Sequence, residues 1–76
     1  MTHAFVFVDC AAGTARSLVD EIRAVDGVEQ AHVVAGDFDV VVELTAVEVR
    51  DLLGKVTRQI RSLDGVGTTR TYVALE

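Results

Sequence analysis

Arg23-Ala24-Val25-Asp26-Gly27-Val28 recurs later in the chain as Arg61-Ser62-Leu63-Asp64-Gly65-Val66, and this repeat decides the fold. Each copy follows a segment with helical spacing of apolar residues and precedes an apolar run that favours a strand. Glycine tolerates the left-handed backbone that ends many helices, so each Asp-Gly pair predicts a joint between a helix and a strand. The two halves therefore predict the element order βαββαβ.

The first half is predicted from the residues on either side of the first joint. Residues 3–9 (HAFVFVD) are rich in Phe and Val and predict a strand. A helix follows, because apolar residues then recur at helical spacing: Ala15, Leu18, Val19, Ile22 and Val25. After the joint, residues 28–35 predict a second strand. A tight turn at Gly36-Asp37 would join it to a third strand at residues 38–44, which makes an antiparallel hairpin.

The second half completes the pattern. Thr45 followed by Glu48 fits a capping box, which predicts a helix from there to Leu63. Gly54 interrupts this helix, and a close contact between helix and sheet would explain it. Residues 68–75 predict the fourth strand.

The predicted fold is an α+β, ferredoxin-like βαββαβ sandwich with residues 1–76 as one domain. Right-handed crossovers give a four-stranded antiparallel sheet in the order 4-1-3-2, with two helices on one face.

Both faces of this sheet are expected to carry apolar residues. Phe5 and Phe7 alternate with Ala4, Val6 and Val8, and the third strand puts Phe38 on the side of Val40, Val42 and Leu44, with Val41 on the other. Half of the 76 residues are hydrophobic, and the lone Cys10 cannot form an internal disulfide. We therefore expect the second face to be covered by another copy in a two-fold homodimer, which can assemble further.

Charge and hydrophobicity exclude several classes of partner. Seven basic against twelve acidic residues give a net charge of −5, which argues against direct nucleic-acid binding and against anionic membranes. No apolar run is long enough to span a bilayer, and the start of the chain lacks the features of a secretory signal. A cytoplasmic protein with a reduced thiol is expected.

Two segments resemble a known family. Residues 33–40 (VVAGDFDV) resemble the V-x-G-D-[FY]-D hairpin of the Lrp/AsnC regulators, and residues 63–73 (LDGVGTTRTYV) resemble the ending of the same C-terminal effector-binding, or RAM, domain. The resemblance covers essentially the whole chain. The sequence begins at the first strand of that domain without a helix-turn-helix, so it resembles a stand-alone form, and DNA binding is not carried over.

The resemblance implies a small-molecule effector, typically an amino acid, bound in a crevice between neighbouring dimers. The dimers form by sheets that pack face to face, and co-assembly with full-length Lrp/AsnC regulators is an expected partnership. The implied site residues are Gly36, Asp37, Asp39, Thr69 and Thr71. A Gly-Asp turn exposes backbone N–H groups, carboxylates accept from an ammonium group, and threonine hydroxyls can donate to a carboxylate.

Less specific interpretations remain for the same residues. Aspartate is common at hairpin turns, and threonine is a good strand former. His3 and His32 lack visible metal-binding partners, and no metal, cofactor or catalytic residue is predicted. Two other functions stay open: a small dimeric ferredoxin-like enzyme, such as a monooxygenase or isomerase using His32 or Tyr72 inside its barrel, and a purely structural oligomerisation module. A pocket inside each subunit would favour the enzyme, whereas a pocket between copies would favour the effector-binding domain.

Overall fold

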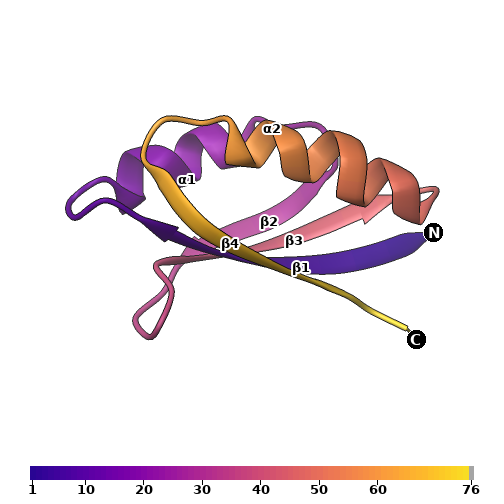
Figure 1. The fold of residues 1–76 in the computed structure, drawn as a ribbon, viewed down its shortest axis with the longest axis horizontal. Helices are drawn as coiled ribbons and strands as arrows, with labels where there is room; N and C mark the ends of the chain where they lie inside the picture. Colours follow the sequence, from indigo (N-terminus) through magenta and orange to yellow (C-terminus); the bar gives the residue numbers. More distant parts are fainter. Residues whose placement is uncertain (76) are drawn as a thin grey trace.

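A computed structural model describes residues 1–75, without the side chain of Lys55. Four strands and three helical segments follow one another in the predicted order: β1 (Thr2–Cys10), α1 (Ala15–Arg23), β2 (Val28–Val33), β3 (Val40–Ala46), η1 (Asp51–Val56), α2 (Thr57–Arg61) and β4 (Val66–Val73). The strands form one antiparallel sheet in the order β2-β3-β1-β4, and all helical segments cover the same face (Figure 1). The predicted ferredoxin-like fold and strand order are confirmed. Among the described residues, no helix has the length and apolar character needed to cross a bilayer.

The two Asp-Gly joints have the backbone that the repeat predicts. Gly27 has φ +99° and Gly65 has φ +93°, a backbone region that residues with a side chain rarely adopt. At Gly27 the joint is also tight, because a Cβ there would lie 2.9 Å from Cγ2 of Val56. The first joint therefore packs directly against the helical segment of the second half.

The core lies between the helices and the sheet. Alternate residues of the two central strands are completely buried there: Ala4, Val6, Val8, Val40, Val42 and Leu44. Leu18, Ile22, Leu52 and Ile60 cover them from the helices. Because successive side chains of a strand point to opposite faces, the odd-numbered residues of β1 and β3 lie on the face away from the helices, here called the open face.

The second helical region begins later than predicted, and two expectations about it are wrong. Thr45 does not cap a helix: it lies within β3, and its hydroxyl donates to the Glu29 carboxylate at 3.0 Å. Helical backbone starts at Val49, and the segment η1, from Asp51 to Val56, has the i to i+5 hydrogen bonding of a π-helix. Gly54 makes no close contact with the sheet, since a Cβ there would meet nothing within 4 Å.

Thr57 secures the junction of η1 and α2. Its buried hydroxyl donates to the carbonyl oxygen of Leu52 at 2.7 Å, and its backbone N–H is directed at the same oxygen. We expect Thr57→Val to lower the free energy of unfolding by about 1 kcal/mol, because the isosteric change removes only the hydroxyl donor. Urea denaturation measures this, with Thr57→Ser, which keeps the hydroxyl, as the control. A valine variant as stable as the parent would contradict the assignment.

Candidate functional site

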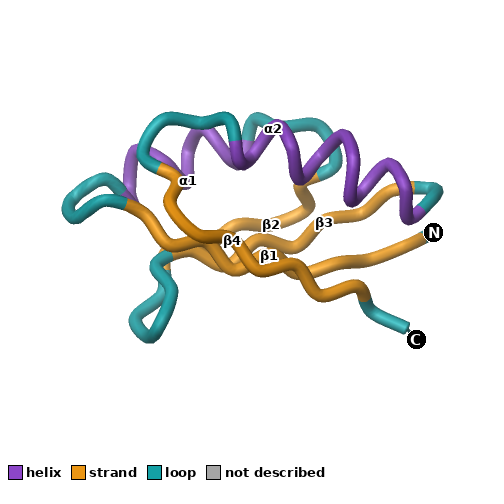
Figure 2. The backbone as a smooth tube through the Cα atoms, in the orientation of Figure 1, coloured by secondary structure: helices purple, strands orange, loops and turns teal. Residues whose placement is uncertain are grey.

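The connection between β2 and β3 stands out from the rest of the sheet. The predicted two-residue turn at Gly36-Asp37 is wrong. Residues 34–39 instead form a longer loop, closed where the N–H of Val34 donates to the carbonyl of Asp39 at 2.9 Å. The loop projects from the sheet on the side away from the helices (Figure 2). A Cβ on Gly36 would meet nothing within 4 Å, so the backbone is open to approach there.

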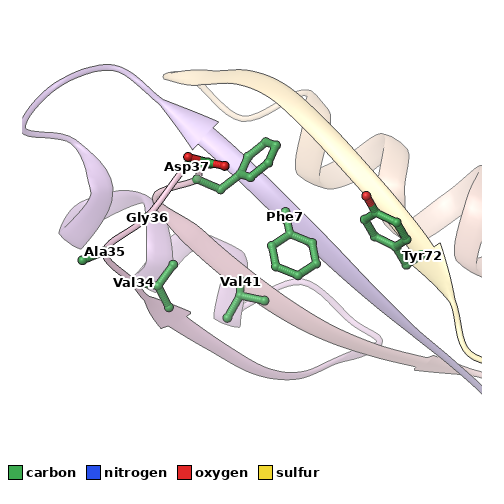
Figure 3. Close-up of a pocket in the computed structure, with 8 residues that line it drawn as sticks. Phe7, Val34, Ala35, Gly36, Asp37, Val41 and Tyr72 are labelled. Carbon is green, nitrogen blue, oxygen red and sulfur yellow. The ribbon is translucent and has the colours of Figure 1, made fainter.

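A hollow of about 650 Å³ lies between this loop and the open face (Figure 3). It is lined by loop residues 34–38 and, from the three neighbouring strands, by Phe7, Val41 and Tyr72. Its lining is mainly apolar, and its volume is in the range of small-molecule sites. The hollow is open to solvent in the single chain.

Aromatic rings form one wall of the hollow. The Phe7 ring lies 5.9 Å from that of Phe38 and 5.7 Å from that of Tyr72, to which it is perpendicular. Phe38 was predicted to share the face of Val40, and that prediction is wrong. Strand alternation does not apply to Phe38, because β3 begins only at Val40.

Asp37 is the one carboxylate in the lining, which contains no Lys, Arg or His. Arg70 lies on the same face of the sheet, because it pairs with Phe7 across β1 and β4, but it does not line the hollow. The charge within the hollow is therefore negative.

Asp39 has a different role from Asp37. Its Oδ2 atom accepts a hydrogen bond from the N–H of Cys10 at 2.9 Å, and its own N–H donates to the carbonyl of Val8 at 2.9 Å. Asp39 therefore ties the loop to the end of β1, and it does not line the hollow.

This contact predicts a pH-dependent stability. The Cys10 N–H and, to a smaller extent, the Asp9 side chain hold the pKa of the Asp39 carboxyl below its ordinary value of 3.8. Because the folded state lowers this pKa, the contribution is complete above the unfolded value and is lost as pH falls through the folded value. We expect Asp39→Asn to melt below the parent at neutral pH, and the difference to shrink below about pH 4. Melting curves across this range test it, with Asp37→Asn on the same exposed loop as the control for charge. An equal difference at every pH would contradict it.

Thr69 and Thr71 lie on the other face of the sheet. They pair with Val8 and Val6, so they share the helix side of β4, which is an edge strand. One chain thus brings Gly36 and Asp37 together at the hollow, while it uses Asp39 to hold the loop and keeps both threonines apart from the hollow.

The aromatic wall is a feature that the sequence did not predict. Alternation places Phe7 on the open face, and the predicted strand order places the fourth strand beside the first, so the contact between Phe7 and Tyr72 could have been found. The place of Phe38 could not have been found from alternation and strand order, because it depends on the course of the loop.

The histidines are engaged with neighbouring side chains. Nδ1 of His3 lies 3.7 Å from Oε2 of Glu43, and Nε2 of His32 lies 3.1 Å from Oε1 of Gln30. Within residues 1–75, no three His, Cys, Asp or Glu side chains form a group that could hold a metal ion. His32 and Tyr72, on which the enzyme hypothesis depends, lie on the open face and not between helices and sheet.

Comparisons with known proteins give consistent results. The family described as "Lrp/AsnC ligand binding domain" matches residues 3–76. An uncharacterised HTH-type transcriptional regulator of Pyrococcus furiosus is 32% identical over 96% of this chain, which covers 51% of that regulator. The chain spans about half the length of the curated regulators from three Pyrococcus species that it matches.

Solved structures share the fold. The crystal structure of TTHA0845 from Thermus thermophilus is 30% identical, with a TM-score of 0.92 over 100% of this chain and 95% of that one. A transcriptional regulator from Neisseria meningitidis, crystallised as a complex with L-Met, has a TM-score of 0.74 at 18% identity; the match covers 99% of this chain and 50% of that one. At that identity the likeness concerns the fold alone.

Proposed function

Because this chain belongs to the Lrp/AsnC ligand binding domain family, we propose that it is an amino-acid-binding regulatory domain, not an enzyme, and that it acts as an oligomer. Its relatives are HTH-type transcriptional regulators, and the matched family is a ligand-binding domain of such regulators. The observation that carries the proposal is the open hollow beside the projecting loop of residues 34–39, since this is the segment that resembles the family's hairpin.

The open face supports a homodimer. Phe5 is 39% exposed and Tyr72 is 56% exposed on this face, and neither packs against a helix. Complete burial of one such side chain contributes about 1.5–3 kcal/mol, and two-fold symmetry doubles each contribution. The proposed dimer therefore forms by contact between two open faces, and dimers can associate further.

The separation of the predicted site residues supports a ligand site that two copies share. Gly36 and Asp37 would come from the loop of one copy, and Thr69 and Thr71 from the edge strand of a neighbouring copy. Asp39 would hold the loop in position. An amino-acid ligand is supported by the complex of the Neisseria meningitidis regulator with L-Met, which has the same fold.

The relatives also support a place of action and a partner for the domain. Residues 1–76 act as a single ligand-binding domain, in the cytoplasm, where transcriptional regulators work. Co-assembly with full-length Lrp/AsnC regulators, through the same open face, would let the bound amino acid alter their response.

Titration with each of the twenty amino acids tests the proposed function. At about a hundredfold excess over Kd, a bound ligand should raise the free energy of unfolding by about 2.7 kcal/mol, which thermal shift detects readily. Thr71→Val should raise the Kd of that ligand about tenfold, because it removes one hydroxyl at the proposed site. The oligomer should stay intact. Thr68→Val, at an exposed position of the same strand, is the matched control. If no amino acid raises the melting temperature, the proposed function is wrong.

A further inference from the structure

We propose that the pairing of two open faces takes up protons at His3, so that the homodimer is tighter at pH 6 than at pH 8. This inference rests on the homodimer of the proposed function and adds a means of regulation to it. The observation that carries it is a pair of ionisable side chains within the open face, where the His3 imidazole lies beside the Glu43 carboxylate.

The Glu43 carboxylate lies where a second open face would cover it. Glu43 pairs with Phe5 of β1 on one side and with Gln30 of β2 on the other, so it stands within the sheet and not at its edge. Its side chain is 34% exposed in the single chain, and a second copy would remove much of the water that remains. A carboxylate that loses water without a cationic partner is strongly unfavourable. The strength of the dimer therefore depends on what neutralises Glu43.

His3 supplies the partner for Glu43. Its Nδ1 atom lies 3.7 Å from Oε2 of Glu43. The other basic side chains of the four strands, His32 and Arg70, also lie on the open face. His32 is hydrogen-bonded to a neutral amide, and Arg70 lies on β4, beyond β1. Within the part of the chain that the structure describes, His3 is thus the residue that forms an ion pair with Glu43.

The other charged and titratable groups around His3 come from three places. The amino group of Met1 precedes it in the chain. On β3 it pairs with Thr45, whose hydroxyl donates to the Glu29 carboxylate, so a second carboxylate lies at this end of the open face. On β4 the nearby titratable side chain is Tyr72, a phenol that carries no charge between pH 6 and pH 8. The two carboxylates therefore favour a protonated His3.

The dimer should hold the His3 proton more tightly than the single chain does. Imidazole is the side chain that changes charge between about pH 5 and pH 8. In the dimer, a protonated His3 neutralises a carboxylate that has lost its water, and this attraction is stronger in the drier interface. The contribution is therefore complete at low pH and is lost as pH rises. Each copy brings one His3, so two-fold symmetry gives two such sites.

Sedimentation of the intact protein between pH 6 and pH 8 measures the dissociation constant of the dimer. We expect this constant to be at least about tenfold lower at pH 6 than at pH 8. His3→Gln should abolish the difference. Glu43→Gln should give at pH 8 a dissociation constant as low as that of the parent at pH 6, because the covered group then carries no charge. His32→Gln, which changes the other histidine of the same face, is the matched control and should keep the parent's pH dependence.

The outcomes separate this inference from the proposed function. A dimer whose dissociation constant is equal at pH 6 and pH 8, or rises as pH falls, overturns the inference alone. So does a pH dependence that persists in His3→Gln, because the amino terminus or Glu43 itself would then take up the proton. A parent without pH dependence that gains one in Arg70→Gln assigns the neutralisation of Glu43 to Arg70 of the second copy, and also overturns it. A chain that stays monomeric at every pH contradicts the homodimer and the inference together.

Discussion

Replacement of Phe5 by glutamate is expected to convert the proposed homodimer into folded monomers. Phe5 lies on the open face, where it pairs with Glu43 on one side and Tyr72 on the other. The change removes an apolar side chain from each copy, which costs about 2 kcal/mol per copy, and places a second carboxylate beside Glu43. Together these effects are expected to raise the dissociation constant of the dimer at least about a thousandfold. Sedimentation at micromolar concentration measures the change.

Two further variants make this result specific. Gln59→Glu introduces the same charge on exposed helix α2, away from the open face, and should remain dimeric. Phe5→Leu keeps an apolar side chain and should dissociate far less than the glutamate variant. Circular dichroism verifies that each variant is folded, as expected because Phe5 is outside the core. A Phe5→Glu protein that is folded and still dimeric shows that the open face is not the interface.

Replacement of Gly27 by alanine is expected to lower the free energy of unfolding more than the same replacement at Gly65, the glycine of the other joint. The backbone at φ +99° strains any residue with a Cβ, by about 1–2 kcal/mol. The new methyl would also lie 2.9 Å from Val56 Cγ2 and 3.3 Å from the Thr45 carbonyl, and such overpacking adds about 1–3 kcal/mol. A core of this size supplies only about 3–5 kcal/mol, so much of the protein should be unfolded without denaturant.

The repeat provides the matched control for this prediction. Gly65 occupies the equivalent joint at φ +93°, but its nearest neighbour would be Thr14 Oγ1 at an ordinary 3.5 Å. Gly65→Ala should therefore lower the free energy of unfolding by the backbone strain alone. Urea denaturation compares the two variants, and Val56→Ala should lower the free energy of unfolding less in the Gly27→Ala protein than in the parent, because there it also removes the close methyl. Equal losses at Gly27 and Gly65 would show that the contact with Val56 has no energetic effect.

The candidate site could be predicted only in part. The family-like segment contains the loop, and Gly36 and Asp37 line the hollow, while ligand binding there stays a prediction. Sequence alone could not separate Asp37 from Asp39, two residues apart, because their difference is the hydrogen bond from Cys10 to Asp39. That bond joins residues far apart in the chain. The positions of Thr69 and Thr71 on the helix side follow from strand register, and whether they meet the loop of another copy stays a prediction.

The sequence by itself determined the βαββαβ order, the strand order of the sheet and the apolar character of both its faces. The element order and the apolar faces depend on strand alternation and on glycine's backbone freedom, which act between near neighbours in the chain, and the strand order follows from the element order because crossovers are right-handed. Only the tertiary structure decided the course of residues 34–39, the side on which Phe38 lies and the late start of the second helical region. Each of these depends on contacts between distant segments, and such contacts outweigh local preference wherever regular alternation ends.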